Sequence, residues 1–358
     1  MPCSVAGEGE RGGAAGEQPP IMTARLARRS FVAGAAGAVA LAGARRPARG
    51  AALTYRYASN LTLDHPLNVA MRECWDAVRR ETGGRLDVRI FPNSQLGGDT
   101  AVLSQLRAGA VQFFTLDGGI LEAVVPVAAI AGVGFAFKDS ADAFAAFDGA
   151  LGDFVRAQIA AKGLYVHPKM WENGMRQITS ATHPIRRTDD LAGFRIRTPP
   201  GTLWVDLFRS LGASPTPLNF AETYTALQTK LVDGEENPYA IIDPARLYEV
   251  QRYLSVTNHM WSAYHFLGNL DAWKALTDDV RAVVERNLAT YALRQRRDTM
   301  LRNASLLDML ARRGMIVNRA DTATFRAKLT ASGFYTKWKT EFGAAAWDLL
   351  EAHAGRLA

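Results

Sequence analysis

From Leu53 onward, segments typical of strands alternate with segments typical of helices, and this order restricts the fold more than any other feature. The segment that starts at Pro66 repeats apolar residues at helical spacing and ends near Gly83. Residues 86–90 alternate apolar and polar side chains, as a strand does. The strand and helix candidates are residues 53–58, 66–82, 85–91, 99–109 and 110–116. A β-α-β-α-β order predicts a parallel sheet with helices on both faces.

The middle of the chain continues this style, and its last third holds a long helical pattern. The strand candidates are residues 164–170, 194–198 and 263–269, and the helix candidates are residues 202–212 and 222–234. A pattern without Gly or Pro runs from Thr277 to about Arg313 and stops at Gly314. It either spans two lobes or breaks at residues 303–305, and we favour a bend there. Two α/β lobes with a ligand cleft between them are predicted.

The charge balance argues against a nucleic-acid surface. The 358 residues are 48% hydrophobic and carry a net charge of +7, with 42 Lys and Arg against 35 Asp and Glu. Seven Arg and three Glu fall in residues 1–50, which leaves 35 basic against 32 acidic residues from Ala51 on. The basic pI therefore comes largely from the N-terminal segment, and no nucleic-acid partner is predicted.

The N-terminal segment resembles a twin-arginine export signal. Arg28 and Arg29 precede Ser30-Phe31 and a weakly apolar run over residues 32–44, with Ala42-Gly43-Ala44 as one cleavage candidate. The run is too short and too weakly hydrophobic to span a bilayer. We expect residues 1–50 to be a signal region and the mature protein to be periplasmic.

Met22 is a plausible translation start, because a Gly-, Glu- and Pro-rich stretch precedes it. Cys74 would then be the one cysteine of the mature chain, and no intrachain disulfide could form. The fold must in that case rest on its apolar core.

Two arginines lie one residue apart in residues 193–201, GFRIRTPPG. Alternation places Arg195 and Arg197 on the same face of a strand. Taken alone, the pair suits a solvated strand edge as well as a binding site.

Five sequence blocks change that balance, because together they resemble the extracytoplasmic solute-binding subunits of TRAP transporters, the DctP-like family. The blocks start at residues 89, 174, 190, 212 and 248 and read RIFPNSQLGGDTAVLSQLRAGAVQF, GMRQITS, DLAGFRIRTPPG, GASPTPLNFAETYTALQTKLVDGEENP and YEVQRYLSVTNH. The resemblance implies a two-lobe periplasmic binding protein fold. We expect one lobe from residues 51–173 with about 263–303, and a second from residues 174–262 with about 304–358.

The resemblance also implies a binding site for a carboxylate. Arg197 matches the arginine that forms a paired salt bridge with the ligand, and Arg176 and Asn237 match two further groups that reach the carboxylate. Guanidinium suits this role because it offers two parallel donors and stays charged when desolvated. Arg195 is expected to be solvated or structural. Phe220 matches an aromatic residue over the ligand, with an ordinary core Phe as the alternative.

Three further residues complete the predicted site. Trp171 lies five residues before the cleft arginine Arg176 and is expected to line the pocket. Ser59 and Asp117 follow the first and third strand candidates, where the carboxyl ends of strands meet a cleft. His65 is interpreted as a helix-start residue, and residues 234–236 (GEE) as a polar turn.

No enzyme signature accompanies these residues. From residue 51 on, the sequence has no HExxH, no Cys cluster, no GxGxxG, no GxxxxGK[ST] and no GxSxG, so we expect neither catalysis nor a cofactor. The resemblance implies a monomeric binding protein that closes around an organic acid and delivers it to an ion-gradient-driven TRAP permease. A receptor that presents ligand to a periplasmic sensor is the alternative. Because Ile120 stands where sialic-acid binders carry a basic residue, we expect a smaller acid with few other polar groups.

Overall fold

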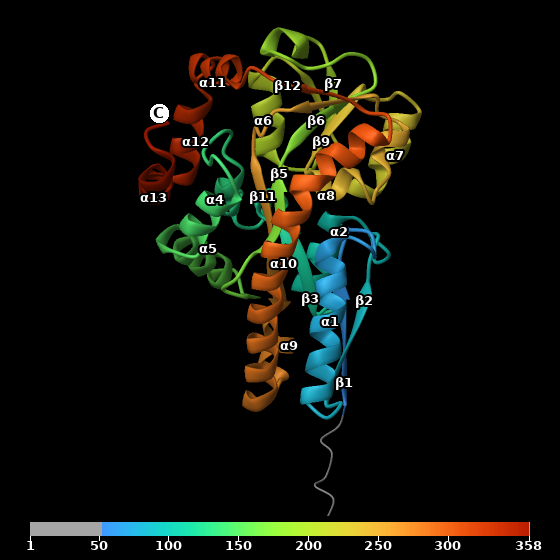
Figure 1. Cartoon of the computed structure of the whole chain (residues 1–358). Coiled ribbons are helices and arrows are strands. Elements are labelled where there is room, and N and C mark those ends of the chain that lie inside the picture. The colour runs from blue at the N-terminus through green and yellow to red at the C-terminus, as the bar shows by residue number, and fades with distance from the viewer. Residues whose placement is uncertain (1–51, 358) are drawn as a thin grey trace, which may run out of the picture. The chain divides into compact units, whose positions relative to one another are not determined.

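The computed structural model describes residues 52–357, whose strands form two six-stranded sheets (Figure 1). The first sheet contains β1 (Leu53–Ala58), β2 (Leu86–Phe91), β3 (Phe113–Asp117), β4 (Leu164–Val166), β5 (Trp171–Met175) and β11 (Trp261–Asn269). Its order is β2-β1-β3-β11-β4, and β5 also pairs with β11. The pairs of β1 with β2 and β3 are parallel, as predicted. The sheet is nevertheless mixed, because β11 runs antiparallel to β3, β4 and β5.

The second sheet is built from shorter strands in the order β12-β10-β6-β9-β7-β8. They are β6 (Gln177–Ser180), β7 (Arg195–Thr198), β8 (Ser214–Pro217), β9 (Gly234–Asn237), β10 (Tyr253–Val256) and β12 (Ile316–Arg319). Strand β7 is parallel to β8 and β9, whereas β6 is antiparallel to β9 and β10. We call the parts of the chain around the two sheets the first lobe and the second lobe.

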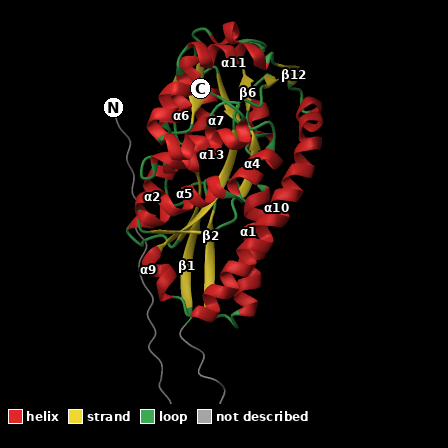
Figure 2. Ribbon diagram, turned by 90° about the vertical axis from the view of Figure 1, so that its left-hand side faces the viewer, coloured by secondary structure: helices red, strands yellow, loops and turns green. Residues whose placement is uncertain are grey.

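Helices lie on both sides of the strands (Figure 2). They are α1 (Pro66–Glu81), α2 (Asp99–Arg107), α3 (Gly118–Leu121), α4 (Ser140–Phe147), α5 (Ala150–Ala161), α6 (Thr202–Ser210), α7 (Phe220–Gln228), α8 (Tyr239–Ile242) and α9 (Leu270–Ala275). In α1 the apolar stripe predicted from the sequence is buried, including Met71, Cys74 and Trp75. Burial of this stripe, at roughly 25 cal/mol per Å² of apolar surface, fixes α1 on the first sheet.

The long helix α10 (Asp278–Arg312) is unbroken over 35 residues. It contacts α1 and β5 of the first lobe and also α8, which follows β9 of the second sheet. The alternative of a break at residues 303–305 does not occur, because the chain has no Gly or Pro there to interrupt the hydrogen bonds. The axis does curve in its last turns (Figure 1). The helix ends before Gly314, whose φ of +99° suits a residue without Cβ.

The last three helices touch both lobes. They are α11 (Thr322–Ala331), α12 (Phe334–Phe342) and α13 (Ala344–Ala354). Helices α11 and α12 contact α6, whereas α13 contacts α4 and α5. The residue boundaries of the lobes given above remain a proposal, and any division of residues 304–357 has to allow for this shared packing.

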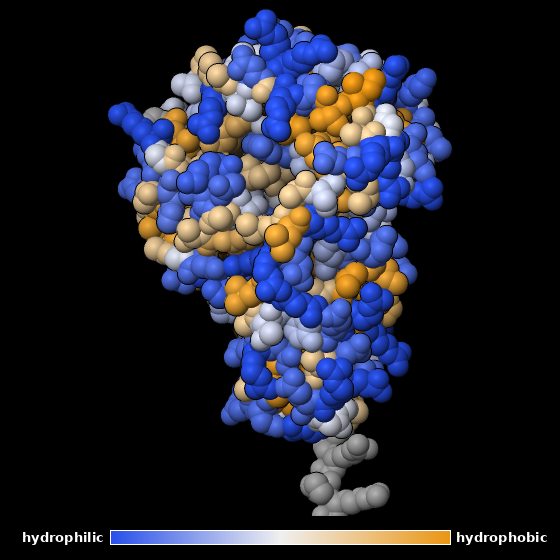
Figure 3. Space-filling view, in the orientation of Figure 1, coloured by the Kyte–Doolittle hydropathy of each residue, from blue (hydrophilic) through white to orange (hydrophobic). Residues whose placement is uncertain are grey.

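The predicted export signal lies outside the described residues. Within residues 52–357, no helix combines the length and the apolar content needed to cross a bilayer. Apolar residues on the face drawn in Figure 3 form separate patches among hydrophilic ones.

Candidate functional site

A small cavity lies between the two lobes, where the ends of elements from both sheets meet. About 20 Å³ of it is open to the centre of a water molecule, room for about one or two waters. The lining residues are Asn60, Leu61, Asp99, Asp117, Ile120, Arg176, Arg197, Pro199, Trp204, Phe220, Asn237, Ile241 and Tyr264. The first lobe supplies carboxyl and amide groups, and the second supplies both arginines.

Arg197 brings a buried cation to this cavity. Its side chain, on β7, donates from Nε and Nη2 to the carbonyl oxygen of Leu218, at 3.0 and 2.6 Å. The ring of Phe220 lies 5.8 Å from its guanidinium carbon. The ion pairs of the described residues include Arg176 and Arg195 but not Arg197. Burial lowers the pKa of Arg197 to about 10, so the group is still charged at neutral pH.

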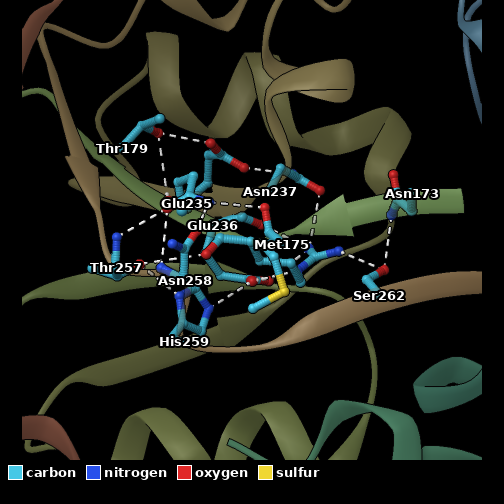
Figure 4. A network of polar contacts seen from close by, with 12 residues as sticks. Asn173, Met175, Thr179, Glu235, Glu236, Asn237, Thr257, Asn258, His259 and Ser262 are labelled. Carbon is cyan, nitrogen blue, oxygen red and sulfur yellow. Dashed lines mark hydrogen bonds and ion pairs between the residues drawn. The ribbon is translucent and has the colours of Figure 1, made fainter. Parts of the chain in front are cut away.

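Arg176, between β5 and β6, has its charge compensated by Glu236. The polar network that includes Glu236, Asn237 and His259 is drawn in Figure 4. The guanidinium donates from Nε and Nη2 to the two carboxylate oxygens, at 2.5 and 2.8 Å. Nε2 of His259 lies 3.1 Å from Oε2 of the same Glu236 carboxylate. Burial alone would lower the pKa of Arg176, but Glu236 raises it. Burial would likewise raise the pKa of Glu236, but Arg176 holds it below its usual value.

The interpretation of residues 234–236 as a polar turn is wrong. These residues form strand β9, and Glu235 and Glu236 are both fully buried. Glu236 can be buried because it is paired with Arg176, which the sequence places 60 positions away. Glu235 accepts from Thr179 Oγ1 at 2.7 Å, and burial raises its pKa to about 7.

The amide of Asn237 is held in one orientation by its two neighbours in this network. Its Oδ1 accepts from Nη2 of Arg176 at 3.0 Å, and its Nδ2 donates to Oε2 of Glu235 at 2.5 Å. Asn237, at the wall of the cavity, therefore connects the compensated arginine with a second buried carboxyl group, that of Glu235.

The opposite wall is acidic. Asp117 accepts from the Gly119 amide at 2.8 Å and from Ser262 Oγ at 2.5 Å. Asn60 donates to Asp99 at 2.9 Å. Burial raises the pKa of Asp99 to about 6 and also raises the pKa of Asp117. This wall can accept hydrogen bonds from hydroxyl groups of a ligand.

Asn60, Asp99 and Trp204 are among the lining residues that sequence reasoning missed. Asn60 follows β1 and Asp99 begins α2 after β2, so the rule that selected Ser59 and Asp117 could have found them. Trp204, whose ring lies 5.4 Å from the guanidinium carbon of Arg176, gave no signal beyond its place in an amphipathic helix.

Five of the seven predicted site residues line the cavity, and two do not. Those that do are Asp117, Arg176, Arg197, Phe220 and Asn237. Trp171 is buried among the apolar side chains of the first lobe. Ser59 uses its Oγ to accept from the Leu61 amide at 3.2 Å. Neither side chain is placed where it contacts the cavity.

The interpretations of Arg195 as a solvated or structural residue and of His65 as a helix-start residue are confirmed. Arg195 is half-exposed and pairs with Asp233, at 2.5 Å, so its role is structural. His65 is the N-cap of α1, and its Nδ1 accepts from the Leu67 amide.

An open groove of about 490 Å³ adjoins the cavity. The two hollows share Asn60 and Phe220, which makes the groove the natural entrance. A larger groove, of about 580 Å³, lies beside Glu122, Pro200 and Lys337, and neither Arg176 nor Arg197 lines it. Among residues 52–357, no cluster of three or more His, Cys, Asp or Glu side chains is arranged to hold a metal ion.

Two curated proteins are similar to this chain over part of their length. An uncharacterized protein of Sinorhizobium fredii is 33% identical over 330 residues, which cover 90% of this chain and 60% of that protein. The 2,3-diketo-L-gulonate-binding periplasmic protein YiaO of Escherichia coli is 34% identical over 212 residues, 59% of this chain and 64% of that one. The matched regions thus span less than two thirds of these two relatives.

A solved structure and a family model complete the comparison. A TRAP periplasmic solute binding protein of Xanthobacter autotrophicus with bound β-D-galacturonate superposes with a TM-score of 0.79 at 28% identity, covering 84% of this chain and 99% of that one. The model of the DctP family, bacterial extracellular solute-binding protein family 7, matches residues 57–335. This is a family of solute-binding proteins rather than enzymes, and the chain belongs to it.

Proposed function

We propose that this protein captures an organic acid in the periplasm through a salt bridge to Arg197 and delivers it to a TRAP membrane permease. The observation that carries the proposal is the guanidinium of Arg197, which is buried at the cavity and forms no ion pair among the described residues, although Glu235, Glu236 and Asp99 favour its charge from farther away. A buried cation of this kind is costly unless a ligand supplies the missing anion. A carboxylate would supply it with paired, charge-assisted hydrogen bonds.

The two arginines have different tasks in this proposal. Glu236 already neutralises Arg176, so Arg176 and Asn237 contribute directed hydrogen bonds rather than net charge. Arg197 contributes the net positive charge. The ring of Phe220 covers the Arg197 guanidinium on one side and limits the access of water to the salt bridge.

Capture requires the lobes to move apart. The cavity has room for about one or two waters, far less than an acid with several carbon atoms needs. The ligand therefore enters an open form along the adjoining groove, and the closed form gains stability from contacts to both lobes. The permease would then recognise the closed form.

The acidic wall refines the ligand class. Asn60, Asp99 and Asp117 offer acceptors for hydroxyl groups. We therefore propose an acid that carries hydroxyl groups, in place of the acid with few other polar groups that we expected from the sequence. The apolar side chain of Ile120 lies on the same wall and offers no partner to a second charged group. A short hydroxylated acid satisfies both features.

A thermal-shift panel tests the ligand class. We expect β-D-galacturonate or 2,3-diketo-L-gulonate to raise the melting temperature more than succinate or sialic acid at equal concentration. A ligand present at 100 times its Kd stabilises the folded protein by about 2.7 kcal/mol, which is enough to raise the melting temperature by several degrees. A shift with sialic acid and none with the shorter acids would contradict the proposed size, and no shift with any carboxylate would contradict the function.

Export is tested on the N-terminal segment. Changing Arg28 and Arg29 together to Lys should leave the precursor in the cytoplasm, because a receptor reads the arginine pair. Cell fractionation with an antibody to the mature chain measures the outcome. Mature protein in the periplasm of this variant would indicate the general secretory route instead.

A further inference from the structure

Two glycines of the first lobe contact side chains of the second lobe too closely to carry a methyl group. A Cβ added to Gly98 would lie 2.7 Å from Cγ and Oδ1 of Asn219. A Cβ added to Gly119 would lie 2.1 Å from the ring of Trp204. Real Cβ atoms essentially never approach other heavy atoms within 3.0 Å.

The backbone does not explain either glycine. Gly98 has φ −67° and ψ 164°, which any residue adopts, and it is the N-cap of α2. Gly119 lies in α3 and is absent from the residues with positive φ. Glycine is therefore needed at both positions because the side chains of Asn219 and Trp204 in the second lobe fill the space that a Cβ atom would occupy.

Each glycine is adjacent to a carboxyl group of the cavity. Gly98 precedes Asp99, and the Gly119 amide donates to Asp117 at 2.8 Å. Their contacts in the second lobe also lie beside the cavity, because Asn219 precedes Phe220 and Trp204 is itself a lining residue. The two contacts thus fix the separation between the acidic wall and the wall that carries Arg197.

We propose that Gly98 and Gly119 are positioning residues that set how closely the lobes close around the ligand. A side chain at either position holds the acidic wall away from the ligand, although it touches no ligand atom. This inference rests on the proposed function, because it takes the cavity as the place where the acid binds.

The contact at Gly98 is tested with a rescue. Calorimetric titration with β-D-galacturonate should show Gly98→Ala weakened by about 5- to 100-fold, since the closed form bears the cost of overpacking. Asn219→Ala, which lies outside the cavity lining, should bind nearly as the wild type does. The double variant should return to within about twofold of Asn219→Ala, because the obstructing amide is gone. Wild-type affinity in Gly98→Ala, or no rescue in the double variant, overturns the proposal.

The contact at Gly119 should give the larger loss. The ring of Trp204 is 2% exposed and lies against Arg176, so it has no free space to move into. Gly119→Ala should bind β-D-galacturonate too weakly to measure while the ligand-free melting temperature changes little. Gly152→Ala is the matched control, because its Cβ would lie 1.8 Å from the backbone carbonyl oxygen of Phe147 within one lobe. The control should lose stability and keep affinity; the same pattern in Gly119→Ala would overturn the proposal.

A cross-link separates this inference from the proposed function. The double variant Gly98→Cys, Asn219→Cys should form a disulfide under mild oxidation without any ligand, detected by mobility on a non-reducing gel, while the native Cys74 stays buried. Failure to cross-link overturns the closing contact. If the pair does cross-link but the wild type binds no acid, the contact stands and the proposed function fails.

Discussion

Arg197→Ala is expected to weaken the binding of an organic acid by about 2 to 5 kcal/mol, roughly 30- to 5,000-fold. The ligand carboxylate would be buried opposite Phe220 and Trp204 without its cation. The fold should persist, because the side chain of Arg197 donates to one carbonyl oxygen, that of Leu218, and takes part in no ion pair of residues 52–357. Calorimetry with the best acid of the thermal-shift panel measures the loss.

Two further variants make this result specific. Arg197→Lys should recover little affinity, because an ammonium group cannot form two parallel hydrogen bonds to a carboxylate. Arg195→Ala is the matched control: it removes an arginine from the same strand, but one that is half-exposed and paired with Asp233. The control should bind as the wild type does. Near-native affinity in Arg197→Ala or Arg197→Lys would show that the anchor lies elsewhere.

The different environments of these two arginines show what strand periodicity can and cannot predict. Alternation correctly groups Arg195 with Arg197 on one face, but it contains no information on depth along the strand. Arg195 begins β7 at the solvent edge, and Arg197 lies two residues nearer the cavity. The resemblance to the DctP-like family distinguished Arg197 as the expected ligand anchor from Arg195, and strand periodicity alone could not make that distinction.

Long-range pairing limited the prediction of the sheets and of the buried charges. The parallel order of β1, β2 and β3 follows from local segments, but β11 enters the same sheet antiparallel from almost 150 residues later. Glu236 looked solvated because a lone carboxylate is costly to bury. Its partner Arg176 was identified as a site residue, yet nothing in the sequence indicated that the two would meet.

Trp171 illustrates a different limit. An apolar residue near a site residue in sequence can pack into the core instead, and Trp171 lies among the buried apolar residues of the first lobe. Asn60 and Asp99, in contrast, were within reach of the rule that loops at the carboxyl ends of strands form the cleft. Asn60 lies one residue after Ser59 behind the same strand, β1, and Asp99 follows β2.

Glu236→Ala is expected to destabilise the fold by about 3 to 5 kcal/mol, because it leaves the buried guanidinium of Arg176 without its counter-charge. Nε2 of His259 loses its partner as well, whereas Nδ1 keeps its contact with Thr257. Thermal or urea unfolding of the ligand-free protein measures the effect. Glu81→Ala is the control: it removes a carboxylate from the exposed pair with Arg286 and should cost under about 1 kcal/mol.

The cause of that loss can be isolated by removing both charges. The double variant Arg176→Met, Glu236→Leu should be more stable than Glu236→Ala, because no unpaired charge is left buried. It should still bind acid poorly, since the hydrogen bonds of Arg176 at the cavity are gone.

In Glu236→Ala itself, Arg176 becomes a second uncompensated cation at the site, so a bound carboxylate should raise the melting temperature by more than it does in the wild type. An unchanged melting temperature for ligand-free Glu236→Ala would mean that Arg176 does not depend on Glu236, and the different tasks proposed for the two arginines would then be wrong.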